Sequence, residues 1–175
     1  MLQAGDQAPE FNLGSSAGGR VDSRTLRGRR YLLYFYPRDD TPGCTREACA
    51  FRDLSAGFEA MSVPVFGVSA DDLKAHDRFI AKHALNFPLL SDPGHQLLEA
   101  YGVWMEKTLY GRKFLGIQRS SFVVGVDGKI EKCWPKVSPD SHAQEVLDYL
   151  AGRAPVKVGT ANAGRKRNTK PMSPG

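Results

Sequence analysis

The chain has 175 residues, of which 41% are hydrophobic and 25% are charged, and this size and balance are typical of one folded domain. The sequence contains no apolar run of 18 residues and no basic segment followed by an apolar stretch at its start, so we expect neither a membrane span nor a secretion signal. Its three cysteines are too few, and odd in number, for the disulfide framework of a secreted domain, which favours a reducing, cytoplasmic location.

The net charge of +5 is concentrated at the C-terminal end. From residue 153 onward there are 6 basic residues and no acidic one, and the rest of the chain has 18 basic residues against 19 acidic ones. We therefore expect a folded domain over residues 1–152 and a basic, disordered tail over residues 153–175. Such a tail could bind nucleic acid nonspecifically through its charge, but a solvated tail is the simpler interpretation, and we expect no specific nucleic-acid partner.

Apolar runs predict the strands. The Gly- and Ser-rich stretch over residues 11–30 is typical of a hairpin or an edge addition that precedes the main sheet. Continuous apolar segments predict strands buried on both faces at residues 31–37, 63–69 and 87–92. The segment 121–134 predicts a hairpin that turns at Asp127-Gly128.

Capping signals place helices between these strands. Thr41 is a candidate N-cap with Pro42 as the first helical residue, which predicts a helix to about residue 60. Ser69-Ala-Asp-Asp72 resembles a capping box with Asp in place of Glu, and Ser141-His-Ala-Gln144 fits the capping box itself. Helical crossovers join parallel strands and a tight turn joins antiparallel ones. The sequence therefore predicts a layered α/β domain with a mixed central sheet.

Cys44 would lie directly after a buried strand, in the first turn of a helix. There the thiol is close to unpaired backbone N–H groups and to the positive end of the helix dipole, which favours the nucleophilic thiolate. Gly43 would allow a ligand to approach closely. A buried structural cysteine at a helix start explains the same local pattern, so both interpretations stay open on these residues alone.

Cys49 follows Cys44 by five residues on the same expected helix. An ideal helix separates the two Cα atoms by roughly 8.6 Å, and a disulfide needs less than about 7 Å. The two cysteines therefore never pair, or they pair only when the start of the helix unwinds.

The segment YFYPRDDTPGCTREACAFRD resembles the active-site segment of the peroxiredoxins. Pro37, Thr41 and Cys44 match the family's Pro-x3-Thr-x2-Cys pattern, and the CTxxAC continuation is similar to the bacterioferritin-comigratory-protein (PrxQ) branch. The resemblance extends over roughly residues 3–150. It implies a thioredoxin-like fold, with a central mixed sheet flanked by helices and an N-terminal β-hairpin extension.

The resemblance also implies roles for five residues. Cys44 matches the peroxidatic cysteine, which attacks the peroxide and becomes a sulfenic acid. Thr41 matches the threonine whose hydroxyl contacts the thiolate and the peroxide, and Pro37 matches the proline that shields the site. Arg119 matches the arginine that stabilises the thiolate and polarises the peroxide. Glu47 matches the acid that orients this arginine.

Cys49 matches the resolving cysteine of the subset that forms an intramolecular disulfide. The resemblance thus implies reduction of hydrogen peroxide and organic hydroperoxides, recycling by thioredoxin or a glutaredoxin-like reductant, no metal or organic cofactor, and a monomer. A redox sensor that passes its disulfide to a partner protein is the alternative. Cys133 is expected to be a buried or half-buried filler at a strand end, with a resolving or intermolecular role as the alternative. His76 and His83 could share a helical face, yet nothing else on that helix completes a metal site.

Overall fold

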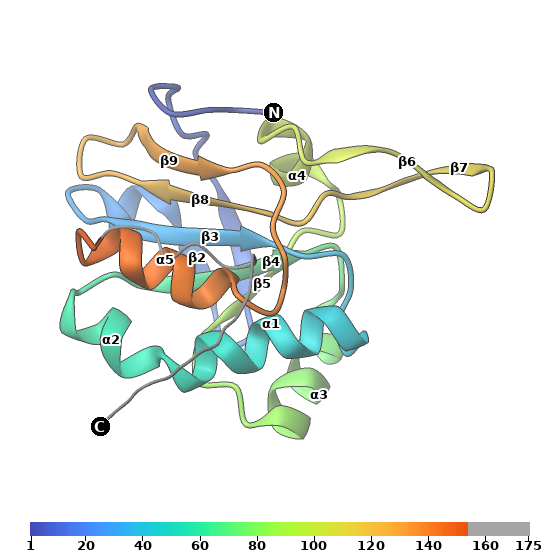
Figure 1. Ribbon diagram of the computed structural model, residues 1–175, viewed down its shortest axis with the longest axis horizontal. Helices are drawn as coiled ribbons and strands as arrows, with labels where there is room; N and C mark the ends of the chain where they lie inside the picture. Colours follow the sequence, from blue (N-terminus) through green and yellow to red (C-terminus); the bar gives the residue numbers. More distant parts are fainter. Residues whose placement is uncertain (154–175) are drawn as a thin grey trace, which may run out of the picture.

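The apolar runs of the sequence form the strands of a mixed sheet. The computed structural model describes residues 1–153, and within this range a seven-stranded sheet has the order β2-β1-β5-β4-β3-β8-β9 (Figure 1). The strands of this sheet are β1 Asn12–Ser15, β2 Arg20–Asp22, β3 Tyr31–Phe35, β4 Val65–Ser69, β5 Leu89–Ser91, β8 Ser120–Val124 and β9 Ile130–Trp134. Strands β3, β4 and β5 pair in parallel, and the remaining pairs are antiparallel. The predicted mixed sheet is confirmed, with β1 and β2 forming the N-terminal hairpin at one edge.

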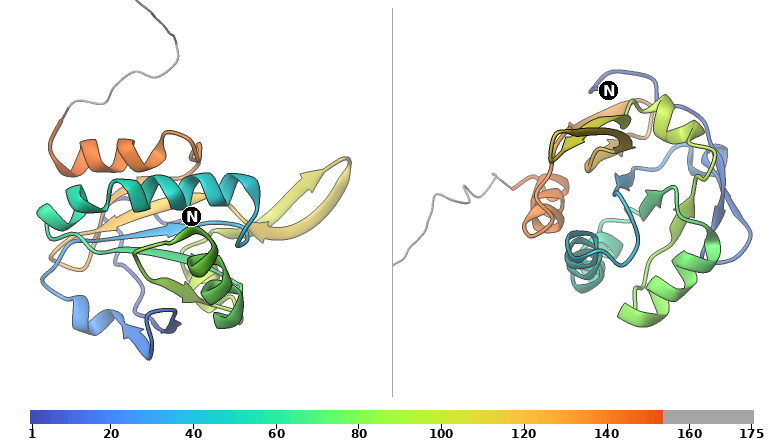
Figure 2. Two further views of the ribbon diagram at one scale, coloured as in Figure 1. Left: turned by 90° about the horizontal axis from the view of Figure 1, so that it is seen from below. Right: turned by 90° about the vertical axis from the view of Figure 1, so that its right-hand side faces the viewer.

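Helices cover both faces of this sheet. They are the 3-10 helix η1 Ser23–Leu26 and the α-helices α1 Pro42–Asp53, α2 Ser55–Ala60, α3 Leu73–His83, α4 Gln96–Ala100 and α5 His142–Leu150. Helices α1 and α5 lie side by side on one face (Figure 2). Helix α4 and the N-terminal segment pack on the other face, and α3 packs beside β5. The layers leave the C-terminal ends of the parallel strands free to carry loops.

Strand β3 shows why this sheet has two cores. Its five residues are all buried, and alternate side chains of a strand point to opposite faces. Leu32 and Tyr34 pack in the cluster under α1 and α5, whereas Tyr31, Leu33 and Phe35 pack in the cluster on the other face. A strand buried on both faces needs the continuous apolar run that the sequence contains.

Three helix predictions need correction. Ser141 is the N-cap residue of α5, but its side chain makes no capping hydrogen bond, and the Gln144 amide donates to Asp148 instead. The helix expected over residues 41–60 is broken at Leu54, whose φ of −99° and ψ of 10° separate α1 from α2. The helix expected after Ser69 is α3, and its N-cap is Asp72, which accepts a hydrogen bond from the backbone N–H of Ala75 at 2.8 Å. Ser69 is instead the last residue of β4, and its hydroxyl donates to the carboxylate of Asp71. The cap was misplaced because Ser69 and Asp72 both precede the helix and both are good capping residues.

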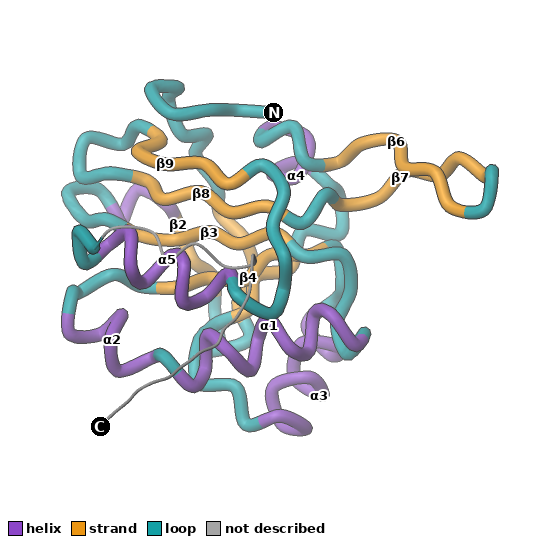
Figure 3. The backbone as a smooth tube through the Cα atoms, in the orientation of Figure 1, coloured by secondary structure: helices purple, strands orange, loops and turns teal. Residues whose placement is uncertain are grey.

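A second hairpin has no counterpart in the predictions. Strands β6 Trp104–Leu109 and β7 Arg112–Ile117 form a two-stranded arm that projects from the rest of the molecule (Figure 3). Its turn residues Tyr110 and Gly111 both have positive φ, 51° and 75°. Asn or Asp is the usual first residue in a turn of this kind, and Tyr110 in that place hid the hairpin.

The predicted basic tail lies outside the described residues, except for Arg153. The guanidinium of Arg153 pairs with Asp148 at 2.8 Å. Among residues 1–153, every helix is too short or too polar to cross a lipid bilayer.

Candidate active site

The start of α1 holds Cys44 at the C-terminal end of β3. Thr41 is the N-cap in an extended conformation, Pro42 is the first helical residue, and Cys44 is third, as expected from the sequence. The Cys44 side chain is buried, with 1% of the residue exposed. A thiol in this position faces the free N–H groups of the first helical turn, which favour an anion there.

Arg119 joins Cys44 to Glu47. It precedes β8, and its Nη2 donates to Sγ of Cys44 at 3.3 Å while its Nη1 donates to Oε1 of Glu47 at 2.7 Å. The two partners lie one turn apart on α1, so one planar guanidinium reaches both. The structure therefore places the positive charge of the Arg119 guanidinium within hydrogen-bonding distance of the Cys44 sulfur.

Glu47 is a carboxyl group with almost no access to water. It is 0% exposed, and its Oε2 has no hydrogen-bond partner among the described residues. Burial raises the pKa of Glu47 to about 7, although the charge and the hydrogen bond of Arg119 oppose this shift. Burial lowers the pKa of Arg119, but the charges of Glu47 and Cys44 and their hydrogen bonds outweigh it, so the net direction is upward. The guanidinium thus remains a cation while Glu47 can titrate near neutral pH.

The loop between β3 and α1 carries the other two predicted residues. Pro37 is partly buried at the start of this loop. The hydroxyl of Thr41 donates to the carbonyl oxygen of Arg38 at 2.9 Å. The hydroxyl hydrogen is thus used within the loop, and the hydroxyl oxygen keeps lone pairs that can accept a further bond. The contact of Thr41 with the sulfur stays a prediction.

Cys44 and Cys49 lie on the same unbroken helix, and all three cysteines are free thiols. Cys49 is half-buried, and on an ideal helix its Cα atom lies roughly 8.6 Å from that of Cys44. Cys133 lies in β9, opposite Phe122 of β8, and burial raises the pKa of its thiol. The helix that holds Cys44 in place therefore also keeps it from Cys49.

Two further residues shape this site: sequence reasoning gave Gly43 a different role and missed Lys107. A Cβ atom on Gly43 would lie 3.1 Å from Nη2 of Arg119 and 3.5 Å from Cγ of Pro139. Gly43 is therefore needed for the close approach of the guanidinium, whereas the sequence suggested only room for a ligand. The arm contributes Lys107, whose Nζ donates to the carbonyl oxygen of Ile117. Burial and the nearby charge of Arg119 lower the pKa of Lys107.

Three potential metal ligands gather beside the loop: Asp39, Asp71 and His76, whose donor atoms lie within 4.8 Å of one another. The tertiary structure thus brings two carboxylates from outside α3 to His76. Each group already has a protein partner, because His76 bonds Asp39 and the carbonyl of Leu90, and Asp71 bonds the Ser69 hydroxyl and the Asp39 backbone. The chemistry of the cluster is that of a satisfied hydrogen-bond network.

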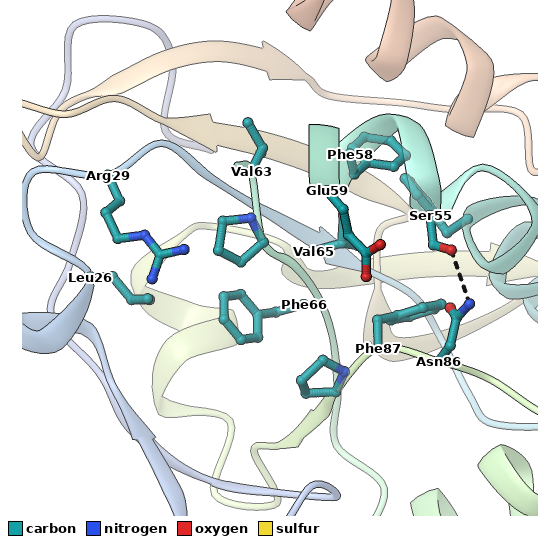
Figure 4. A pocket seen from close by; sticks show the side chains of 13 residues that line it. Leu26, Arg29, Ser55, Phe58, Glu59, Val63, Val65, Phe66, Asn86 and Phe87 are labelled. Atoms are coloured by element: carbon teal, nitrogen blue, oxygen red, sulfur yellow. Dashed lines mark hydrogen bonds between the residues drawn. The ribbon is translucent and has the colours of Figure 1, made fainter. Parts of the chain in front are cut away.

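A cavity of about 380 Å³ lies at the opposite end of the sheet. Figure 4 shows its lining, which comes from η1 and the loop after it, α1, α2, β4 and the segments that lead into β4 and β5. Phe58, Phe66 and Phe87 provide apolar walls, and Asn86 donates to the hydroxyl of Ser55. The lining includes neither Cys44 nor Glu47 nor Arg119, so the Cys44 site and this cavity are separate features.

The chain matches a known protein family over most of its length. The AhpC/TSA family model matches residues 4–133. Peroxiredoxin Bcp of Escherichia coli K12 is 42% identical over 153 residues, which are 87% of this chain and 98% of that protein.

Two solved structures are similar over nearly their whole lengths. The chain resembles a cysteine-to-serine variant of PrxQ from Xylella fastidiosa with a TM-score of 0.82 and 36% identity, over 87% of this chain and 97% of that one. It also resembles the bacterioferritin comigratory protein of Xanthomonas campestris with a TM-score of 0.80 and 37% identity, over 85% and 98%. The latter structure is a trapped intermediate/ligand complex, which gives insight into the alkyl peroxide reduction activity of that protein.

Proposed function

The chain belongs to the AhpC/TSA family, among the Bcp (PrxQ) peroxiredoxins, and from this membership we propose which of its residues carry out each step. It is a thiol-dependent peroxidase with a thioredoxin-like fold. Hydrogen peroxide and organic hydroperoxides are the proposed substrates, and the alkyl peroxide reduction described for the Xanthomonas campestris protein supports the organic class.

Cys44 is the proposed nucleophile. Its thiolate attacks one peroxide oxygen, the O–O bond breaks, and the departing oxygen takes a proton to leave as water or an alcohol. Cys44 becomes a sulfenic acid, which is the reversible first stage of thiol oxidation. The observation that carries this assignment is the 3.3 Å bond from Arg119 to Sγ at a helix N-terminus, because a neighbouring cation and free N–H donors each favour the thiolate.

Arg119 is the proposed electrostatic catalyst. Its planar fork can donate to the thiolate and then to the oxygen on which charge develops, without a costly rearrangement. The buried Glu47 holds the guanidinium from the other side at 2.7 Å, which limits its freedom to turn away. Thr41 and Pro37 complete the proposed site, with the Thr41 hydroxyl oxygen free to accept a bond from the peroxide.

Cys49 is the proposed resolving residue. Its thiol condenses with the Cys44 sulfenic acid, so that a disulfide forms and one water leaves. Because both cysteines lie on α1, the first turns of this helix must unwind for the sulfur atoms to meet. Opening a helix end lies within ordinary local fluctuations. Thioredoxin, or a glutaredoxin-like protein, would then reduce the exposed disulfide by thiol exchange. We place this cycle in a cytoplasmic monomer.

A coupled assay tests the nucleophile. Peroxide consumption is followed with thioredoxin, its NADPH-dependent reductase and three forms of the protein: wild type, Cys44→Ser and the matched control Cys133→Ser. We expect Cys44→Ser to lose turnover, because a serine hydroxyl stays protonated, and Cys133→Ser to keep it. Loss of turnover in Cys133→Ser alone would refute the assignment.

Intact-mass analysis tests the resolving cysteine. After a peroxide pulse, wild type should lose two mass units, and Cys49→Ser should gain oxygen because its sulfenic acid has no partner on α1. Amide exchange over residues 41–58 should increase in the oxidised wild type as the helix opens. A Cys44–Cys133 bond, or a Cys44–Cys49 bond with unchanged exchange protection, would contradict the proposed resolution step.

A further inference from the structure

The loop between β3 and α1 is tied to α3 by a buried ion pair. His76 of α3 is 0% exposed, and its Nδ1 lies 2.6 Å from Oδ2 of Asp39, whose side chain is 5% exposed. The hydroxyl of Tyr36 donates to the other oxygen of the same carboxylate. Asp39 is only two residues before Thr41, so whatever holds Asp39 also holds the entry to α1.

The hydrogen bonds of His76 determine its protonation. Its Nε2 lies 3.0 Å from the carbonyl oxygen of Leu90 in β5. A carbonyl can only accept, so Nε2 carries a hydrogen, and the Asp39 carboxylate requires a second hydrogen on Nδ1. With an ionised Asp39 and both bonds made, His76 is therefore an imidazolium, and this ion spans from the loop to the central sheet.

The charges around His76 favour this ionised form. Burial lowers the pKa of His76, but the hydrogen bond and charge of Asp39, the carbonyl of Leu90 and the charge of Asp71 outweigh it, and the net direction is upward from 6.5. Asp39 comes from the β3–α1 loop, Asp71 from the β4–α3 loop and Leu90 from β5. Asp71 also accepts from the backbone N–H of Asp39 at 2.9 Å. The β4–α3 loop and α3 thus both hold Asp39, and β5 holds His76.

A second pair of contacts on the same loop is exposed. Asp40 has a φ of 61° and pairs with Lys82 at 2.8 Å and with His83 at 3.0 Å, both from the end of α3. The Lys82 side chain is 62% exposed and that of Asp40 is 42% exposed. Exposed pairs of this kind contribute little to stability, whereas removing one partner of a buried pair leaves a buried charge without compensation. The chain thus contains a strong anchor and a weak one on neighbouring residues.

We propose that the His76–Asp39 ion pair is a latch that keeps the loop and the first turn of α1 closed, and so sets how often Cys44 reaches Cys49. The proposal rests on the function proposed above. When the latch opens, the Cys44 sulfenic acid and the Cys49 thiol form a disulfide and release water. While it stays closed, a second hydroperoxide oxidises the sulfenic acid to a sulfinic acid and leaves as an alcohol or as water. His76 is thus a positioning residue that divides the sulfenic acid between recovery and inactivation.

The latch should weaken as pH rises. The pKa of His76 is raised in the closed state and returns toward about 6.5 when the loop opens. The stabilisation of the closed state is therefore complete below pH about 6.5 and is lost as pH increases through the raised pKa. Above it, the Nδ1 lone pair faces the Asp39 carboxylate and repels it. Resistance to over-oxidation should accordingly increase with pH.

The experiment measures how the sulfenic acid divides between these two products. Full-length protein is pulsed with hydrogen peroxide at several concentrations between pH 5.5 and 9.5, and intact mass gives the ratio of disulfide to sulfinic acid. We expect His76→Gln to raise this ratio on the order of tenfold at pH 6, with the difference from wild type shrinking as pH rises. Comparing the two proteins at each pH removes the pH effects that they share. His83→Gln is the matched control, and we expect it to change the ratio less than twofold.

Two further measurements keep the proposal falsifiable. Nitrogen NMR of wild type should show His76 protonated on both ring nitrogens at pH 6. Asp39→Asn, which removes the charge of this buried carboxylate but keeps its shape, should raise the ratio and move the midpoint of the pH profile downward; it carries the test should His76→Gln fail to fold. An unchanged ratio in Asp39→Asn and His76→Gln, an equal effect of His83→Gln, or a neutral His76 at pH 6 would overturn the latch. Wild-type protein without a Cys44–Cys49 disulfide would instead refute the resolution step itself.

Discussion

Replacing Glu47 by Gln should raise the free energy of unfolding relative to that of wild type by more at pH 8 than at pH 4.5. The same substitution should slow peroxide reduction. Glu47 is fully buried, and one of its oxygens has no partner among the described residues. A Gln side chain has nearly the same shape and keeps a carbonyl oxygen for Nη1 of Arg119. It lacks the negative charge that burial disfavours.

The size of the effect follows from the pKa of Glu47, which burial raises from 4.5 to about 7. A raised pKa of an acid means that the folded state holds the proton more tightly, so wild type loses stability as pH increases from 4.5 through 7. The shift corresponds to about 3 kcal/mol of unfolding free energy over this range. The Gln variant lacks this pH-dependent loss. Its free energy of unfolding, relative to that of wild type, should therefore rise by about the same amount over this pH range.

Urea denaturation at pH 4.5 and pH 8 measures this difference. Glu145→Gln is the matched control: its hydrogen bond to His142 lowers the pKa of Glu145, so removing this acid should change the difference in the opposite direction. Peroxide reduction by Glu47→Gln should be about tenfold slower, because a neutral acceptor holds the Arg119 guanidinium less firmly than a carboxylate. An identical pH dependence of stability in wild type and Glu47→Gln would refute the reasoning.

Three other substitutions test the site and its support. Arg119→Lys should slow the reaction with peroxide by about 10²–10³-fold, because a point charge cannot serve both the sulfur and the carboxylate; stopped-flow kinetics as fast as wild type would exclude a catalytic role. Gly43→Ala would bring a Cβ atom to 3.1 Å from Nη2 of Arg119, so we expect slower alkylation of Cys44 by iodoacetamide at pH 7 with little change in stability. Equal alkylation rates would show that the guanidinium does not assist the thiolate. Gly67→Ala would bring a Cβ atom to 2.9 Å from the ring of Tyr34, and overpacking of this kind should lower the unfolding free energy by about 1–3 kcal/mol, as measured by urea denaturation; unchanged stability would mean that the core adjusts freely there.

The sequence by itself predicted three elements whose signals lie within a few neighbouring residues. The apolar run at β3, the Thr41-Pro42 start of α1 and the Asp127-Gly128 hairpin each follow from steric and hydrogen-bonding preferences within a few residues. These preferences place Cys44 in the first helical turn without any tertiary information. The break at Leu54 and the arm built by β6 and β7 lack such strong local signals, so the sequence did not reveal them.

The contacts that give the site its chemistry were decided by the tertiary structure. Arg119 is 75 residues from Cys44, and His76 is 37 residues from Asp39. Resemblance to a family assigned a role to Arg119, but nothing in the sequence indicated that His76 and Asp39 would meet. Such pairs form because the sheet order brings the loops after β3 and β4 and the start of β8 to one end of the molecule (Figure 1). Burial then raises the cost of leaving any of these groups without a partner, and neither proximity nor burial is encoded in a short stretch of residues.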